Sequence, residues 1–186
     1  MMFSDGVMAI AITLLALEIR LPGNGANDLS NPQLLAALRN IVPQYIGYVI
    51  SFLVIGLSWM GHHRNFRMIK RYDTRLMFLN ILYLMSIAFI PFPTRVLIEN
   101  GNLVSTVFYA LSMVVVGMLS SVLFFYAFYK NRLTDPPLDE NVIRIRQLQS
   151  LLTPGVFLLS VGIAFINTDL AKYSWTLLTL LAYTLR

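Results

Sequence analysis

Near its start the chain reads Phe3-Ser4-Asp5-Gly6, followed without a break by the apolar run Val7-Met8-Ala9-Ile10-Ala11-Ile12-Thr13-Leu14-Leu15-Ala16-Leu17. The run has the composition of a helix buried in a membrane, and Asp5 is an ionisable residue at its lip. A charge in that position costs free energy unless it has a partner, so such an acid marks a functional site by default. The stretch therefore predicts a membrane protein whose first helix carries functional residues.

The composition of the whole chain indicates that most of it lies in a lipid bilayer and not in water. Of its 186 residues, 57% are hydrophobic and only 12% are charged, and the mean hydropathy is +0.68. A soluble domain is about 25% charged, and a spanning helix takes about 20 residues. Cysteine is absent, which excludes disulfides and thiolate metal sites. We therefore predict an all-α polytopic membrane protein with six transmembrane helices per subunit.

Apolar runs and turn residues divide the chain into six predicted spans. Two of them contain helix breakers: Pro43 is expected to kink the second, and Pro154-Gly155 predicts a break or kink in the fifth. Residues 1–186 are expected to form a single six-helix domain. The predicted spans cover about residues 3–19, 34–60, 76–94, 103–129, 147–166 and 173–185.

The basic residues gather in two connections, and this predicts the orientation. Five lie between the second and third spans and four between the fourth and fifth; with Arg186, ten of the fourteen fall on one side. Loops rich in Lys and Arg stay in the cytoplasm, so both termini are expected there. The net charge of +5 is explained by these basic residues in the cytoplasmic connections. It therefore does not indicate that the protein binds nucleic acid.

At about 100° per residue, the first helix has two distinct faces. One is an apolar stripe interrupted by a single hydroxyl, and the other combines an acid with small residues suited to close helix contact. From periodicity alone, packing against lipid or other helices is the simpler interpretation of the stripe. The stripe consists of Ile10, Thr13, Leu14 and Leu17, and the second face consists of Asp5, Ala9, Ile12 and Ala16.

Topology brings other polar residues to the depth of Asp5 at the cytoplasmic membrane edge. They are His62, His63 and Arg64 at the end of the second span and Asn80 one turn into the third. An imidazole, a guanidinium or an amide of this cytoplasmic network is expected to hold Asp5 and so to lock the first helix in place. A compatible alternative is that Asp5 caps its own helix together with Ser4.

The two adjacent histidines do not predict a metal site. Neighbouring helical residues point about 100° apart, and no third ligand accompanies them. Either His62 or His63 could make the protein respond to pH, because imidazole titrates near neutrality. No nucleophile elbow, phosphate loop or dinucleotide motif occurs, so the sequence predicts neither an enzyme nor a cofactor.

Two further patterns carry less weight. Glu18, at the outer end of the first span, either concentrates cations at an outer mouth or is an ordinary interfacial charge, since Arg20 lies close enough to neutralise much of its field. Ile46-Gly47-Tyr48 invites comparison with the Thr-Val-Gly-Tyr-Gly filter of ordinary potassium channels. It lies inside a continuous apolar helix, however, so Gly47 is interpreted as a small residue at a helix contact.

Several of these residues together resemble the motifs of a known family, the prokaryotic branch of the transmembrane protein 175 family of endosomal and lysosomal potassium channels. The first three predicted helices carry the resemblance, and the rest of the chain matches by hydropathy. The matching elements are Phe3-Ser4-Asp5-Gly6, Trp59-x-x-His62-His63-x-x-Phe66, Asn80 and Pro91-Phe92-Pro93-Thr94.

The resemblance implies a potassium-permeable leak channel of the bacterial plasma membrane, assembled as a homotetramer around a pore lined by the first helix. Carried over by position, the narrow apolar constriction falls on Ile10, the polar pore position on Thr13, and further apolar rings on Leu14 and Leu17. These rings stand in place of a carbonyl filter. The expected partners are K⁺ ions, membrane lipid and further copies of the chain.

Two alternatives remain open from the sequence. The first is a small secondary transporter or a proton-permeable pore of the same architecture, for which the broken helix at Pro154-Gly155 would indicate the binding site. No midplane acid or internal repeat accompanies that break. The second is a purely structural membrane scaffold, which leaves the arrangement of Asp5 and the histidines without an explanation.

Overall fold

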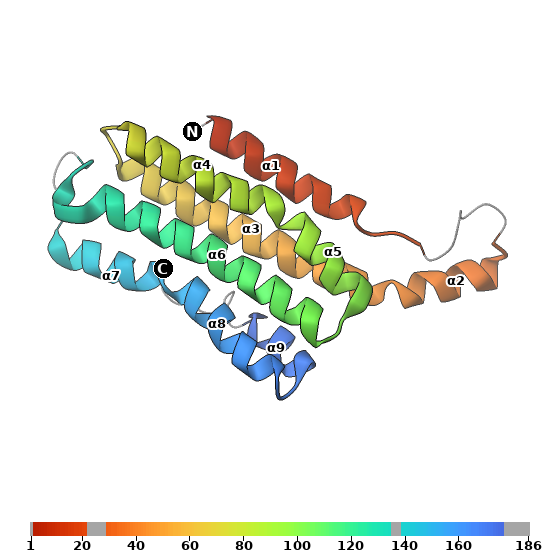
Figure 1. The fold of residues 1–186 in the computed structure, drawn as a ribbon. Helices are drawn as coiled ribbons and strands as arrows, with labels where there is room; N and C mark the ends of the chain where they lie inside the picture. The colour runs from red at the N-terminus through yellow and green to blue at the C-terminus, as the bar shows by residue number, and fades with distance from the viewer. Residues whose placement is uncertain (1, 22–28, 135–138, 177–186) are drawn as a thin grey trace.

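The structure is a computed structural model of the chain. It describes residues 2–21, 29–134 and 139–176, which form helices joined by short connections (Figure 1). Within these residues the one strand-like pairing is a bridge between Ile69 and Thr134. The all-helical architecture predicted from composition is confirmed. In chain order the helices are α1 (Met2–Leu17), α2 (Asn31–Asn40), α3 (Val42–Met68), α4 (Thr74–Phe89), α5 (Pro91–Asn100), α6 (Leu103–Phe128), η1 (Tyr129–Asn131), α7 (Glu140–Ser150), α8 (Leu152–Ala164) and α9 (Thr168–Ser174).

Within the part of the chain that the structure describes, four helical segments are long and apolar enough to cross a membrane. They are α3, α4 with α5, α6 with η1, and α7 with α8. The helix α1 is apolar as well but has only 16 residues. The sixth predicted span, residues 173–185, continues past residue 176 and so lies largely outside the described residues.

The second predicted span, residues 34–60 with a kink at Pro43, differs from the structure. Two helices, α2 and α3, occupy this region, and Pro43 lies in the first turn of α3. Proline suits that turn because its missing N–H has no intrahelical partner there. The helix α3 then continues to Met68, because the packing of the buried side chains of His62 and Phe66 extends it past the apolar run.

The third predicted span, residues 76–94, continues in the structure to Asn100. The helix is interrupted at Ile90, where α4 ends and α5 begins. Pro91 lies in the first turn of α5. The helix α5 ends at Gly101, whose φ of 61° lies in the left-handed region that glycine adopts without steric cost. The apolar segment is therefore longer than the hydropathy of the sequence suggested.

The fifth predicted span, residues 147–166, begins earlier in the structure. The side chain of Asp139 caps α7 by accepting a hydrogen bond from the backbone N–H of Asn141 at 2.7 Å. The break predicted around Pro154-Gly155 lies at Leu151, so that Pro154 falls within the first turn of α8. As at Pro43, a proline starts a helix instead of bending one.

The helix α6 is the centre of the bundle, packing against α4 and α5 on one side and α8 on the other (Figure 1). The helices α6 and α8 approach each other closely at Gly117 of α6. A Cβ built on this glycine would lie only 2.6 Å from Cδ of Pro154 in α8, so a larger residue would not fit. In α3, a Cβ on Gly47 would lie 2.7 Å from Cγ1 of Ile98. Gly47 therefore sits at a helix contact, as interpreted from the sequence.

The two ends of the bundle differ in charge. The first residues of α1, α4 and α7 lie together with the last residues of α3 and α6, at the left in Figure 1. We refer to this as the inner end and to the opposite one as the outer end. At or near the inner end are Arg64, Arg67, Lys70, Arg71, Arg75, Lys130, Arg132, Arg144 and Arg146.

Candidate functional site

The side chains of the predicted stripe on α1 are all exposed on the single chain. The exposed fractions are 61% for Ile10, 41% for Leu14 and 64% for Leu17, and Thr13 is exposed as well. The hydroxyl of Thr13 donates a hydrogen bond to the carbonyl oxygen of Ile10 at 2.9 Å, so its own lone pairs stay available. The stripe is thus an uncovered apolar surface with an oxygen acceptor in its middle.

The face of α1 that packs on the same chain lies away from the stripe, against α3, α4 and α5. It is also rotated from the predicted small-residue face, since Ala9 and Ala16 are exposed whereas Asp5 and Ile12 are half-buried. Within one subunit, the close contacts of α1 are therefore made by residues other than Ala9 and Ala16. The buried face consists of Ser4, Met8, Ala11 and Leu15.

Three helices meet through polar side chains beside the first turn of α1. Asn80 Nδ2 of α4 donates a hydrogen bond to Ser4 Oγ at 3.1 Å, and Asn80 Oδ1 lies 2.8 Å from His62 Nε2 of α3. Because a carbonyl oxygen only accepts, His62 Nε2 carries the proton. The imidazole also stacks on Phe66 and Tyr83 with ring centroids 4.2 and 5.5 Å away. This group links α1, α3 and α4 without using a charge.

Asp5 has a different partner from those expected. Trp59 Nε1 of α3 donates a hydrogen bond to Asp5 Oδ1 at 2.8 Å. The carboxylate also lies in the first turn of α1, where the helix dipole favours an acid. The motif in the sequence contains Trp59 but does not identify it as the partner of Asp5. The spacing of three and four residues from His62 and His63 does place Trp59 on the same side of α3. We call Ser4, Asp5, Trp59, His62 and Asn80 together the inner anchor.

The remaining residues of this predicted site lie at its edge. His63 is tilted against Trp59 with ring centroids 5.5 Å apart, and its Nδ1 is buried without a hydrogen-bond partner. Phe3 is 68% exposed, and a Cβ built on Gly6 would have no neighbouring atom within 4 Å outside its own stretch of helix. Among the described residues, no group of three or more His, Cys, Asp and Glu side chains is arranged to hold a metal ion.

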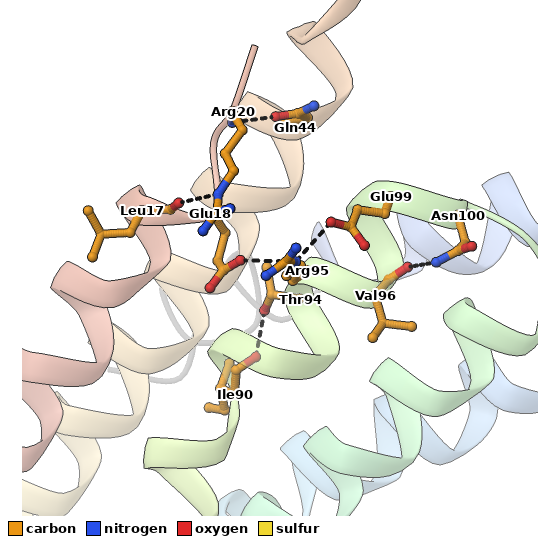
Figure 2. Close-up of polar contacts among 10 residues, drawn as sticks. All are labelled: Leu17, Glu18, Arg20, Gln44, Ile90, Thr94, Arg95, Val96, Glu99 and Asn100. Carbon is orange, nitrogen blue, oxygen red and sulfur yellow. Dashed lines mark hydrogen bonds and ion pairs between the residues drawn. The ribbon is translucent and has the colours of Figure 1, made fainter. Parts of the chain in front are cut away.

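At the outer end, Glu18 follows the stripe and is held by α5 (Figure 2). Arg95 Nε lies 3.5 Å from Glu18 Oε2 and 2.8 Å from Glu99 Oε1. One guanidinium thus faces two carboxylates, and the guanidinium of Arg20 lies at the same end of α1. We call the contact between Glu18 and Arg95 the outer anchor.

The sequence neighbour Arg20 bonds to groups other than Glu18. Its backbone N–H donates to Gln44 Oε1 at 3.0 Å, and its Nε lies 3.5 Å from the carbonyl oxygen of Leu17 (Figure 2). Arg95, which is far from Glu18 in the sequence, supplies the compensating charge instead. Only the packing of α5 beside α1 reveals this partner.

Comparisons with known proteins identify relatives of this chain. The sequence model of one family, described as endosomal/lysosomal potassium channel TMEM175, matches residues 1–91. A potassium channel of Streptomyces collinus is 38% identical over 184 residues, which cover 96% of this chain and 87% of the relative. A potassium channel of Chamaesiphon minutus is 32% identical over 174 residues, covering 91% and 84%.

The fold has a close counterpart among solved structures. It is the crystal structure of a lysosomal potassium-selective channel TMEM175 homolog from Chamaesiphon minutus, with a TM-score of 0.84 and 29% sequence identity. The superposition covers 98% of this chain and 93% of that one. The similarity therefore extends well beyond the residues that the family model matches.

Proposed function

This chain belongs to the family of the endosomal/lysosomal potassium channel TMEM175, and from that premise we propose that α1 lines the ion pathway in an assembly of four copies. The chain is a membrane protein and a potassium channel, as its relatives are named. The proposal rests chiefly on the opposed faces of α1. One face is buried in its own subunit, whereas the stripe is exposed and interrupted by a single hydroxyl.

In the proposed mechanism, four copies of Ile10 form a ring too narrow for a hydrated ion. An apolar ring offers little to replace lost water, and Na⁺ holds its water more tightly than K⁺. Passage through the ring therefore favours K⁺, with a preference more modest than that of a carbonyl filter. Thr13 offers an oxygen acceptor next to the ring, Leu14 and Leu17 form further apolar rings, and tilting of α1 widens the constriction.

The distribution of charge supports an orientation. The inner end carries clustered Lys and Arg residues, which favours a cytoplasmic inner end in a bacterial plasma membrane. Both termini then lie in the cytoplasm, and each subunit contributes six membrane helices as one domain spanning residues 1–186. Glu18 lies at the outer mouth, where its carboxylate attracts cations.

Recording from the reconstituted channel with Ile10→Asn tests the constriction. The amide offers ions a polar substitute for water, so conductance should rise and the preference for K⁺ over Na⁺ should fall. The matched control is Ile81→Asn, the same change at a position of α4 that is 52% exposed and away from α1. An unchanged permeability ratio in Ile10→Asn, with the assembly intact, removes Ile10 from the constriction.

A liposome flux assay distinguishes this channel mechanism from secondary transport. Channel flux is passive and follows the membrane potential without a counter-ion, whereas a transporter requires coupled movement of a second solute. The helix breaks at Ile90 and Leu151 make the comparison worthwhile, because broken helices also occur at transporter binding sites. Obligatory coupling would exclude the channel mechanism.

A further inference from the structure

A cavity of about 190 Å³ lies between α3, α6 and the α7–α8 pair. A single water molecule requires about 15 Å³ of such space, so the cavity accommodates a far larger group. None of the residues that line it belongs to α1. It is therefore separate from the proposed ion pathway and from both anchors.

The walls of this cavity change in character along α3. Apolar side chains line the part near the middle of α3, hydroxyl groups follow, and basic side chains lie nearest the inner end. From Val54 to Arg64 the helix rises about 15 Å, half the roughly 30 Å of a hydrocarbon core. The cavity thus extends over about the depth of one leaflet. Along α3 and α6 towards the inner end, its walls include Val54, Leu57 and Val116, then Ser58 and Ser120, then Arg64 and Phe124; α8 contributes Leu152 and α7 contributes Arg146.

Arg64 and Arg146 bring two positive charges to the same cavity from α3 and α7. Among the ion pairs of residues 2–21, 29–134 and 139–176, none involves either guanidinium. Arg64 is exposed and Arg146 is half-buried, so both guanidinium groups are accessible to an anion from the membrane surface. The planar fork of a guanidinium matches the oxygens of a phosphate group.

We propose that this cavity binds an anionic phospholipid. The phosphate lies between Arg64 and Arg146, and the start of an acyl chain follows the apolar wall towards the middle of the membrane. A free phosphate would satisfy the guanidinium groups but would leave Leu57 and its apolar neighbours facing water. A zwitterionic headgroup would bring its own cation to the two arginines, so phosphatidylglycerol is preferred over phosphatidylcholine.

Native mass spectrometry of the purified full-length channel tests this proposal with three probes: phosphatidylglycerol, phosphatidylcholine and inorganic phosphate. Phosphatidylglycerol should bind most tightly, and the double variant Arg64→Gln/Arg146→Gln should lose about thirtyfold in affinity for it. The matched control is Arg67→Gln/Arg144→Gln, which removes the same charge from the same two helices at exposed residues outside the cavity. This control should change the affinity less than threefold.

Two outcomes would overturn the proposal. An equal loss of affinity in both double variants would mean that the basic inner end attracts the lipid without a specific site. Inorganic phosphate binding as tightly as phosphatidylglycerol would assign the cavity to a free anion.

The variant Leu57→Trp tests the acyl chain separately by filling the apolar part of the cavity. With the assembly verified by size exclusion, this variant should weaken phosphatidylglycerol binding about tenfold while leaving the binding of inorganic phosphate unchanged. Unchanged lipid affinity in this variant would contradict an acyl chain in the cavity.

Discussion

The two ends of α1 are held by different kinds of interaction. At the inner end, Ser4 and His62 are each only 4% exposed and are joined through Asn80 by hydrogen bonds between neutral groups. At the outer end, the side chains of the ion pair between Arg95 and Glu18 are 41% and 19% exposed. Salt screens exposed charges strongly and leaves enclosed hydrogen bonds almost unaffected.

This difference indicates where α1 is free to move. An enclosed network costs much to disrupt because each separated group loses its partner without gaining water. An exposed ion pair contributes roughly 0 to 1 kcal/mol and is easily replaced by solvent. We therefore expect α1 to pivot about the inner anchor, so that its outer half makes the larger excursions.

The largest effect is expected from Asn80→Ala, which removes the centre of the inner anchor. It leaves Ser4 and His62 without their shared partner, and the assembly should lose about 3 kcal/mol of stability. Unfolding in denaturant, followed by tryptophan fluorescence, measures the loss. The control Asn100→Ala removes an exposed amide that bonds to the backbone of α5 and should cost about 0.5 kcal/mol or less. Equal losses in the two variants would contradict a special role for the inner end.

A smaller effect is expected where the inner anchor uses a charge. Trp59→Phe keeps the ring but removes the donor to Asp5, and Asp5→Ala removes the acceptor. A double-mutant cycle of the two should give a coupling energy of about 1 kcal/mol, the usual value for one hydrogen bond. Permeability ratios should stay unchanged in both variants, because Asp5 lies away from the stripe. A change in selectivity would mean that the faces of α1 are assigned wrongly.

At the outer anchor, Arg95→Gln should cost less stability at low ionic strength than either change at the inner anchor. The cost should vanish in 1 M salt, where the Debye length falls to about 3 Å. Stability measured at both salt concentrations, beside Arg20→Gln as the control, tests this directly. A loss as large as that of Asn80→Ala would reverse the comparison between the two ends.

The smallest effect is expected from Asp73, in the connection before α4 at the inner end. Hydrogen bonds from Tyr126 Oη at 2.6 Å and from the backbone N–H of Leu76 at 2.8 Å hold the pKa of this carboxyl below its ordinary value of 3.8. Arg132 Nη2, 3.5 Å away, acts in the same direction. A lowered pKa means that the carboxylate stabilises the fold above pH 3.8 and that this contribution disappears as the pH falls further.

The acid stability of Asp73→Asn tests that contribution. Wild type should lose stability relative to the variant only below about pH 4, whereas the difference between them should stay constant at higher pH. A difference that varies between pH 5 and pH 8 would assign the pH dependence to another group.

The sequence predicted those features that depend on average hydrophobicity and on depth in the membrane. A bilayer requires long apolar helices, so composition and hydropathy were sufficient to predict the all-helical fold. Depth also placed His62 and Asn80 at one level, and these two side chains do meet in the structure. Prolines were harder to interpret, because Pro43 either kinks a helix or begins one, and hydropathy does not distinguish the two.

The partners of individual charges could not be predicted in this way. Asp5 bonds to Trp59, and Glu18 pairs with Arg95, because of how α1 is rotated against α3 and α5. That rotation is decided by the fit of the buried side chains Met8 and Leu15, which hydropathy alone does not specify. The lining of the cavity between α3 and α7 depends in the same way on packing between distant segments.

The hydroxyl of Thr13 has a consequence for anions. A threonine has one proton to donate, and here it is given to the carbonyl oxygen of Ile10. The stripe therefore presents lone pairs and methyl groups but no O–H donor, and an anion that sheds its water beside α1 finds nothing to replace it. A pathway lined by this helix would exclude chloride through the direction of a single hydrogen bond, without any fixed negative charge along the stripe.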